Sequence, residues 1–327
     1  MYFRLLNEAD VAGLLSIDEL IDSMKGALLR FSTGKVVQPV RTVLPVGAGR
    51  SFFGAMPASV RDPEAVGAKL VTVFPGNAAI ELPTHLATIL LFSPDTGALV
   101  AMMDGRYITE ARTAAVSAVS AILLARDETE TLAIIGTGVQ ARSHLTALET
   151  VFDLNEVRVW SPTPEHLVDF LDEMTPIAKA ALVGAPSAER AVRDADLIVL
   201  ATSSSEPVIR NEWVNDGAHV VSVGACRPTE REMDPGLVER GVLYVDSREA
   251  ALVESGDVVM GIREGRFAAS HIAGELGAVI AGTAPGHRWP RDVTIFKSLG
   301  LAVEDVVAAD LVYRRAVAMD VGQELEL

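Results

Sequence analysis

The residues with the clearest chemical meaning form a glycine loop near the middle of the chain. Gly136, Gly138 and Ala141 give the pattern G-x-G-x-x-A, with Val139 and Gln140 inside it, directly after the apolar run "TLAIIG". The first glycine allows a tight turn, the second lets the backbone approach a pyrophosphate, and the alanine keeps the next helix close to the strand. The first turn of that helix offers N–H groups and a positive dipole end to phosphates. The loop therefore predicts a dinucleotide site.

The end of the next strand bears on which nicotinamide dinucleotide is expected. Sites for NAD usually carry an acidic residue there, which bonds the ribose 2′-hydroxyl. Here the strand ends in "VRVWSPTPEH", so Ser161, Pro162 and Thr163 occupy that place. No carboxylate repels a 2′-phosphate, two hydroxyls are offered to it, and Arg142 lies close by on the predicted helix. We expect NADPH in preference to NADH.

The composition excludes several classes of protein. The chain has 327 residues, enough for two domains, and its 49% hydrophobic and 22% charged residues are ordinary for a folded protein. A net charge of −16 argues against a nucleic-acid partner, because such binding needs a concentrated basic face. Cys226 is the only cysteine and the six histidines show no paired spacing, so we expect neither a disulfide nor a metal site.

The apolar segments give no sign of export or of membrane insertion. The N-terminus carries acidic residues and lacks a basic region followed by an unbroken apolar run, so it does not resemble a signal peptide. The nearly uncharged stretch "TAAVSAVSAILLA" at 113–125 is shorter than the roughly 20 residues of a membrane span. We expect a buried helix there and a cytoplasmic protein.

The elements that must position these residues alternate between strands and helices from about residue 131. Short β-branched runs without polar alternation are typical of parallel strands buried on both faces: "TLAIIG", "VRVW", "DLIVLAT", "AHVVSVG" and "VLYVD". They predict an α/β fold, a Rossmann-type doubly wound parallel sheet over residues 121–296. Residues 1–120 instead suggest an antiparallel or mixed sheet with a helix near 17–31. After about residue 293 the chain suggests a strand, a glycine turn and a long amphipathic helix, and 297–327 is assigned to the same domain as residues 1–120. We expect these two segments to form a second, α+β domain into which the first is inserted.

Motifs on both sides of the glycine loop resemble one protein family. "GTGVQA" is preceded by "DGRYITEARTAAVSA" and followed by "VGACRPTEREMD" and "TIFKSLGLAVEDVVAA". Over about residues 35–315 the chain resembles the ornithine cyclodeaminase/mu-crystallin family, and "QPVRTVLPV", "GAMPAS" and "LYVDSREAALVESGDVV" place it nearest to the mu-crystallin members. The resemblance implies an NAD(P)-dependent oxidoreductase acting on small imino or amino acids. It also implies a homodimer whose α+β domain pairs the subunits and binds substrate.

The resemblance further implies roles for three cations. Arg41 in "QPVRTV" and Arg112 in "EARTAA" match arginines that clamp the substrate carboxylate, and Lys69 in "GAKLV" matches an active-site lysine. A lysine packed near two arginines and away from water should have a lowered pKa, which suits proton exchange near neutral pH. Two roles stay open for Lys69: it donates the proton, or it only contacts the carboxylate.

Other polar residues are candidate cofactor contacts, although each is equally a capping or turn group. Two match cofactor-adjacent positions and the rest follow strands: Thr84, Thr113, Thr202, Ser203, Gly224, Cys226 and Ser298. His85 is either structural or catalytic. Glu304 and Asp305 are expected as charges at a helix N-terminus. Asp305 is also kept as a less favoured candidate for a base.

Cys226 separates the possible reactions. In the family's cyclodeaminases and alanine dehydrogenases, an aspartate that handles the substrate amine stands at the matching position of "VGACRPTERE"; mu-crystallin has a serine. A thiol of ordinary pKa, about 8.5, is a poor replacement for that carboxylate. Reduction of a preformed ketimine needs fewer catalytic groups from the protein, because the substrate nitrogen is already basic. We therefore expect an imine reductase for a cyclic or 2-imino carboxylic acid, such as pyrroline- or piperideine-2-carboxylate, with Cys226 as a small pocket wall near the nicotinamide.

Two alternatives to this reading follow from the same residues. The alternative enzyme is an amino-acid dehydrogenase, for alanine or an N-alkyl amino acid, or an ornithine cyclodeaminase. The non-enzyme alternative is a crystallin-like protein that binds a nucleotide or small ligand. The presence of Arg41, Lys69 and Arg112 together counts against a pure binder, which does not need the whole cationic set.

Overall fold

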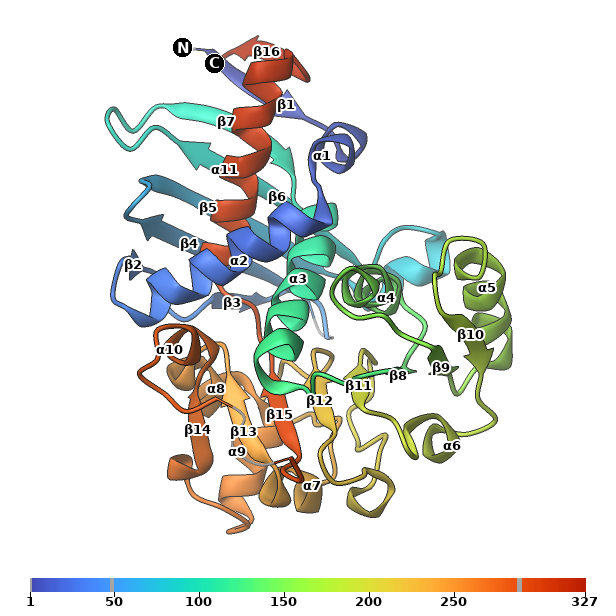
Figure 1. The fold of residues 1–327 in the computed structure, drawn as a ribbon. Helices are drawn as coiled ribbons and strands as arrows, with labels where there is room; N and C mark the ends of the chain where they lie inside the picture. Colours follow the sequence, from blue (N-terminus) through green and yellow to red (C-terminus); the bar gives the residue numbers. More distant parts are fainter. Residues whose placement is uncertain (1, 48–49, 287–289) are drawn as a thin grey trace. The chain divides into compact units, whose positions relative to one another are not determined.

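The computed structural model describes residues 2–47, 50–286 and 290–327, and the chain divides into two compact units (Figure 1). The first unit combines the residues up to Arg112 with Gly300–Leu327, and the second is Thr113–Leu299. From the sequence, the chain was expected to pass from one unit to the other at 120/121 and at 296/297. The first crossing lies inside one continuous helix, α3 (Arg106–Leu124), where no turn residue marks it.

The first unit is built on a mixed eight-stranded sheet. The strands follow the order β16-β1-β7-β6-β5-β4-β2, with β3 paired to β4. The β1–β7 pair is parallel, and the other described pairs are antiparallel. The bounds are β1 (Tyr2–Leu6), β2 (Val36–Val37), β3 (Thr42–Pro45), β4 (Phe52–Val60), β5 (Ala65–Val73), β6 (His85–Phe92), β7 (Leu99–Asp104) and β16 (Gln323–Glu326). Burial alternates along β5, so one of its faces turns to the core.

Helices cover this sheet. Their bounds are α1 (Glu8–Leu14), α2 (Ile17–Ser32) and α11 (Ala302–Met319), with a 3₁₀ turn at Pro75–Ile80. Asn7 begins α1 with a capping box to Asp10, which satisfies two terminal N–H groups. Helix α11 packs on β4, β5 and β6 and lies beside α2, as Figure 1 shows. The helix expected near 17–31 and the long C-terminal helix are both confirmed.

Helix α3 is the one described helix that is long and apolar enough to cross a membrane by length and composition. Two thirds of its most apolar window is nevertheless buried inside the structure. Residues 113–121 of the stretch singled out in the sequence are all buried. The prediction of a buried helix is therefore confirmed for this part of α3.

The second unit is a parallel, doubly wound sheet with the order β10-β9-β8-β11-β12-β15-β13-β14. The bounds of its strands are β8 (Thr131–Ile135), β9 (Glu156–Trp160), β10 (Ala181–Gly184), β11 (Leu197–Leu200), β12 (His219–Ser222), β13 (Val242–Val245), β14 (Ile272–Glu275) and β15 (Thr294–Lys297). The order reverses between β8 and β11, the point where such sheets bind ligands. All five strands expected from the sequence are present, and the Rossmann-type fold class is confirmed.

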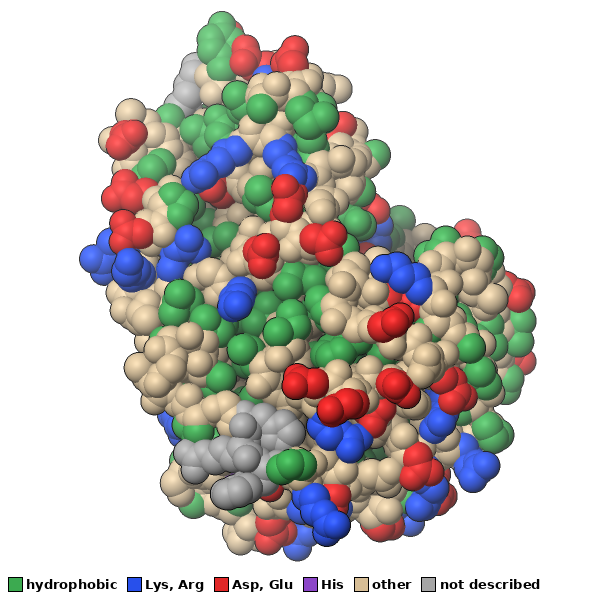
Figure 2. All heavy atoms as spheres, in the orientation of Figure 1, with side chains coloured by type: hydrophobic (Ala, Val, Ile, Leu, Met, Phe, Trp, Pro, Cys, Tyr) green, Lys and Arg blue, Asp and Glu red, His purple; other side chains and the backbone are tan. Residues whose placement is uncertain are grey.

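Helices connect these strands, and their inner faces form a continuous apolar core with the sheet. The helices are α4 (Val139–Val151), α5 (Pro164–Met174), α6 (Ala188–Val192), α7 (Pro235–Arg240), α8 (Arg248–Glu254), α9 (Gly256–Arg263) and α10 (Leu276–Ile280), with 3₁₀ turns at Asn211–Trp213 and Ala269–His271. On the face drawn in Figure 2, basic side chains are interspersed with acidic ones.

Candidate functional site

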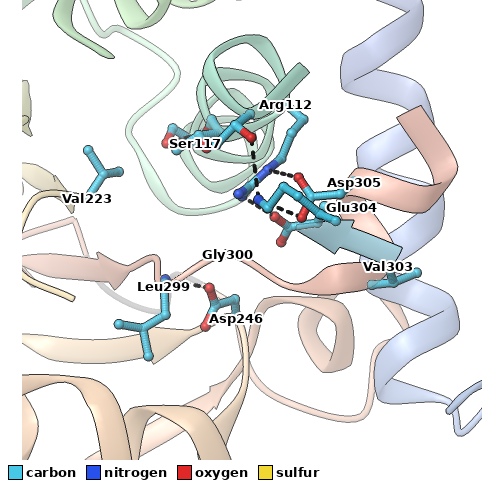
Figure 3. A network of polar contacts seen from close by, with 12 residues as sticks. Arg112, Ser117, Val223, Asp246, Leu299, Gly300, Val303, Glu304 and Asp305 are labelled. Carbon is cyan, nitrogen blue, oxygen red and sulfur yellow. Dashed lines mark hydrogen bonds and ion pairs between the residues drawn. The ribbon is translucent and has the colours of Figure 1, made fainter. Parts of the chain in front are cut away.

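A buried cluster of ion pairs forms in the first unit, where β5, α3 and α11 meet (Figure 3). Asp305 lies between two cations: its Oδ2 is 2.8 Å from Lys69 Nζ, and its Oδ1 accepts from Arg112 Nε at 3.0 Å. Glu304 Oε2 accepts from Arg112 Nη1 at 2.6 Å. All four side chains are almost fully excluded from water, and both acids are 0% exposed. Charges buried to this degree persist only because they are paired.

The environment of Lys69 changes its acidity. Desolvation, followed by repulsion from Arg112 and Arg41, lowers the pKa of Lys69 to about 8, against the opposing attraction of Asp305. Lys69 Nζ also donates to Thr109 Oγ1 at 3.4 Å. For Asp305, burial alone would raise the pKa, but Arg112 and Lys69 outweigh it and hold the pKa below its ordinary value. The lowered lysine pKa expected from the sequence is confirmed in direction.

Arg41 and His85 stand beside this cluster. Arg41 donates from Nη2 to Gly300 O at 3.2 Å, just before the start of α11. Burial, with repulsion from Lys69 and Arg112, lowers the pKa of His85 to about 4. His85 is therefore neutral at neutral pH and adds no positive charge. The structure thus brings together the three cations that the sequence singled out, and places His85 close to them.

Glu304 and Asp305 lie in the first turn of α11, so the charges expected at a helix N-terminus are confirmed. Their burial was not expected: both side chains are fully buried. Asp305 pairs with Lys69 and Arg112, and Glu304 pairs with Arg112. The sequence carries a signal for this: "AVEDVV" places two acids within a run in which Val303 and Val306 are also buried. An acid on the buried face of a helix implies a cation opposite it.

The glycine loop of the second unit has the geometry of an anion cradle. Gly136 has φ +112° and donates its N–H to Trp160 O, and a Cβ there would lie 2.3 Å from Ala201 O. Gly138 begins α4 without a side-chain cap, and a Cβ there would meet no described atom within 4 Å. Ala141 is fully buried against the sheet. The start of α4 is therefore open at Gly138, and the N–H groups at a helix start are suited to a pyrophosphate.

The loops after β11 and β12 are tied together by Glu232, a residue that sequence reasoning missed. Its Oε1 accepts from Thr202 N and Oγ1, and its Oε2 accepts from Gly224 N at 2.7 Å. A Cβ on Gly224 would collide with Thr202 O at 2.1 Å, so glycine is required there. Burial raises the pKa of Glu232, against the attraction of Lys297. Thr202 and Gly224 therefore shape the loops through backbone packing and internal bonds.

The end of β9 holds the residues connected with cofactor choice. Ser161 Oγ accepts from Thr163 N at 3.2 Å, and Thr163 begins α5 with no side-chain cap bond. Arg142 pairs with Glu173 at 2.7 Å and stacks on Phe170. The two hydroxyls therefore lie at the end of β9, whereas Arg142 on α4 already has an acidic partner on α5.

The remaining candidates are spread through both units. Ser203 is exposed, Ser298 is buried after β15, and Cys226 Sγ donates to Val223 O at 3.5 Å. Thr113 is buried on α3, and Thr84 is exposed just before β6. Among the residues with described positions, no group of three or more His, Cys, Asp or Glu could hold a metal ion.

Known proteins share this arrangement along almost the whole chain. The model of the ornithine cyclodeaminase/mu-crystallin family matches residues 3–320. Mouse ketimine reductase mu-crystallin is 45% identical over 303 residues, which cover 92% of this chain and 93% of that protein. The structure of Thermococcus litoralis Delta(1)-pyrroline-2-carboxylate reductase in complex with NADH and L-proline has a TM-score of 0.96 at 37% identity, covering 98% and 99% of the two chains. An archaeal alanine dehydrogenase dimer with bound NAD has a TM-score of 0.94 at 32% identity and full coverage of both chains.

Proposed function

Because this chain belongs to the ornithine cyclodeaminase/mu-crystallin family, we propose that it is an NAD(P)H-dependent imine reductase acting on a small cyclic or 2-imino carboxylic acid. The substrates that fit best are pyrroline-2-carboxylate and piperideine-2-carboxylate. The observation that carries the proposal is the buried lysine paired with Asp305 in a cluster with Arg112, where desolvation and nearby cations lower its pKa to about 8. Reduction of a C=N bond consumes one hydride and one proton, and such a lysine is suited to supply the proton.

The glycine loop fits a dinucleotide, as the open space at Gly138 and the uncapped start of α4 indicate. When bound, the nicotinamide supplies the hydride. The N–H groups at the start of α4, from Gly138 onward, would hold the pyrophosphate. Gly136 makes the tight turn, its own N–H being bonded to Trp160 O, and Ala141 keeps α4 against the sheet. These residues bind and orient, and the proton chemistry belongs to the first unit.

The cations of the first unit hold the substrate and its proton. Arg41 and Arg112 bind the substrate carboxylate, and Glu304 and Asp305 fix the guanidinium of Arg112 through its Nη1 and Nε atoms. A bound carboxylate also relieves the repulsion that both arginines exert on Lys69. Lys69, protonated at pH 7 and close to its pKa, donates to the imine nitrogen.

Cys226 supports imine reduction over the two alternative reactions. Cyclodeamination and reductive amination both need a base for an amino group, and the thiol of Cys226 is instead bonded to the carbonyl of Val223. A preformed imine needs no such base. The likeness to an alanine dehydrogenase structure keeps the second reaction as the competitor to test.

A substrate panel tests the proposed function. NADPH and NADH oxidation is followed with pyrroline-2-carboxylate, with piperideine-2-carboxylate, and with pyruvate plus ammonia or methylamine. We expect the highest kcat/KM with a cyclic imine. A keto acid and amine turned over faster than either cyclic imine would make the chain an amino-acid dehydrogenase. Dinucleotide binding without reduction of any imine would make it a binding protein.

We propose NADPH as the preferred cofactor, since Ser161 and Thr163 stand where NAD sites carry an acid. Ser161→Asp is expected to raise KM for NADPH at least tenfold, because the new carboxylate repels the 2′-phosphate, and to change KM for NADH less than threefold. Steady-state kinetics with both cofactors measure this. The control is Ser93→Asp, since Ser93 likewise accepts a backbone N–H in a turn but lies in the first unit. A wild type that prefers NADH would contradict the proposal.

We also propose that the protein is a homodimer formed through its first unit. That unit exposes several large apolar side chains around β3 and the start of β6: Val43, Leu44, Ile80, Leu82 and Leu86. Exposed apolar clusters of this kind commonly mark protein interfaces. The alanine dehydrogenase relative is a dimer, which supports a dimeric state for this protein. Light scattering after gel filtration would give twice the chain mass.

A further inference from the structure

Glu232 is a fully buried acid that the proposed chemistry does not use. Its carboxylate accepts five hydrogen bonds from two stretches of chain. Thr202 donates its N–H at 2.8 Å and its hydroxyl at 2.6 Å to Oε1, and Ser222 Oγ donates to Oε2 at 3.1 Å. Gly224 N and Ala225 N donate to the same Oε2 at 2.7 and 3.3 Å. One side chain thus holds the loops that follow β11 and β12.

Two further buried charges hold Glu232 itself in place. Asp257, in the first turn of α9, accepts from Glu232 N at 3.1 Å and from Met233 N at 3.0 Å. Lys297, on β15, lies 3.5 Å from Asp257 Oδ2 and donates to Ser222 Oγ at 3.1 Å. The Ser222 hydroxyl oxygen accepts the bond from Lys297, so its O–H is free to donate a hydrogen bond to Glu232. These contacts make the network rigid, because each member restrains the orientation of the next.

The two loops that Glu232 joins follow β11 and β12, and the glycine loop follows β8, the neighbour of β11 in the sheet. A Cβ on Gly136 would touch Ala201 O, and a Cβ on Gly224 would touch Thr202 O, so each loop packs on its neighbour. The ribose position at the end of β9 directs the adenosine half of a dinucleotide to one side of the β8 loop. The other half must then extend over the ends of β11 and β12, where Glu232 acts.

We propose that Glu232 is a positioning residue of the dinucleotide site, which fixes the loops after β11 and β12 so that they receive the nicotinamide half of the cofactor. The inference rests on the proposed function, because it needs a dinucleotide at the glycine loop. It assigns to Glu232 no contact with the cofactor: the carboxylate acts through Thr202, Gly224 and Ala225.

Fragment binding tests this role directly. Glu232→Gln keeps the shape of the side chain but replaces an acceptor oxygen by an amide NH₂, which cannot accept from a backbone N–H. The dissociation constants of NADPH, NADH, ADP and 2′,5′-ADP are measured by calorimetry, together with Tm. We expect binding of the preferred dinucleotide to weaken at least tenfold, while the two fragments, which lack the nicotinamide half, stay within twofold of wild type.

A matched control separates positioning from general loss of stability. Glu149, on α4, is also a buried acid that accepts two backbone N–H groups, those of Lys179 and Ala180 ahead of β10. Glu149→Gln should lower Tm and leave all four dissociation constants unchanged. If Glu232→Gln does not fold, Thr202→Val removes one donor to the carboxylate, with about threefold weaker dinucleotide binding and unchanged fragments expected.

The outcomes distinguish this inference from the function beneath it. Equal weakening of dinucleotide and fragments by Glu232→Gln, or by Thr202→Val in its place, would overturn the positioning role alone. Unchanged dinucleotide binding would overturn it as well. A wild-type protein that binds neither dinucleotide would overturn the proposed function and this inference together.

Discussion

Replacing Lys69 by methionine is expected to lower kcat/KM for the cyclic imine by about 10²–10⁴-fold, the range typical of a lost general acid. Methionine matches the length of the lysine stem but carries neither the proton nor the charge. The pKa of Lys69, lowered to about 8, also predicts the pH profile. Wild-type kcat/KM should fall as pH rises through about 8, because the lysine then loses the proton that it must donate.

Lys69→Arg distinguishes the two roles left open for this residue. Arginine keeps a charge for the carboxylate but does not release a proton near neutral pH. If Lys69 is the proton donor, the arginine variant is as slow as the methionine variant. An arginine variant that recovers most of the activity and loses the alkaline limb would leave Lys69 only a carboxylate contact. Lys35→Met, at an exposed lysine of the same unit that pairs with Asp62, is the control and should match wild type.

The second unit could be predicted well from the sequence because its strands are apolar runs with clear turn signals. β10 and β14 were missed, since "ALVG" is largely exposed and "IAGE" is short and contains glycine. The position of β15 between β12 and β13 could not be predicted either. In a parallel sheet, a strand that comes late in the chain can lie between two earlier strands if its connecting segment is long enough. The domain crossing inside α3 leaves no compositional trace.

The candidate site was predictable in its cations and not in its acids. The sequence predicted the cations because they lie in motifs that resemble those of the family: Arg41, Lys69 and Arg112. Their partners come from α11, far away in the chain, and pairing across such separations follows from tertiary packing alone. Glu232 was hidden for the same reason: "RPTERE" reads as a polar loop, and only the fold shows that its last acid turns inward.

Asp305→Asn is expected to destabilise the protein by about 3–5 kcal/mol, because it removes the charge that two buried cations share. Asparagine preserves the shape, so the effect reports charge and not a cavity. Asp310→Asn, on the same helix, breaks the partly exposed pair with Arg314 and should cost roughly 0–1 kcal/mol. Urea unfolding of the three proteins measures both values, and equal losses in the two variants would contradict the structural assignment.

The same variant should also move the pH profile, which a purely structural role of Asp305 would leave unchanged. The attraction of Asp305 raises the pKa of Lys69, whereas desolvation and repulsion from Arg112 and Arg41 lower it. Removing the carboxylate leaves only the lowering effects, so the pKa of Lys69 falls below about 8. The alkaline limb of kcat/KM in Asp305→Asn should therefore begin at lower pH than in wild type. A limb that stays in place while stability falls would mean that Asp305 holds the fold without setting the protonation state of Lys69.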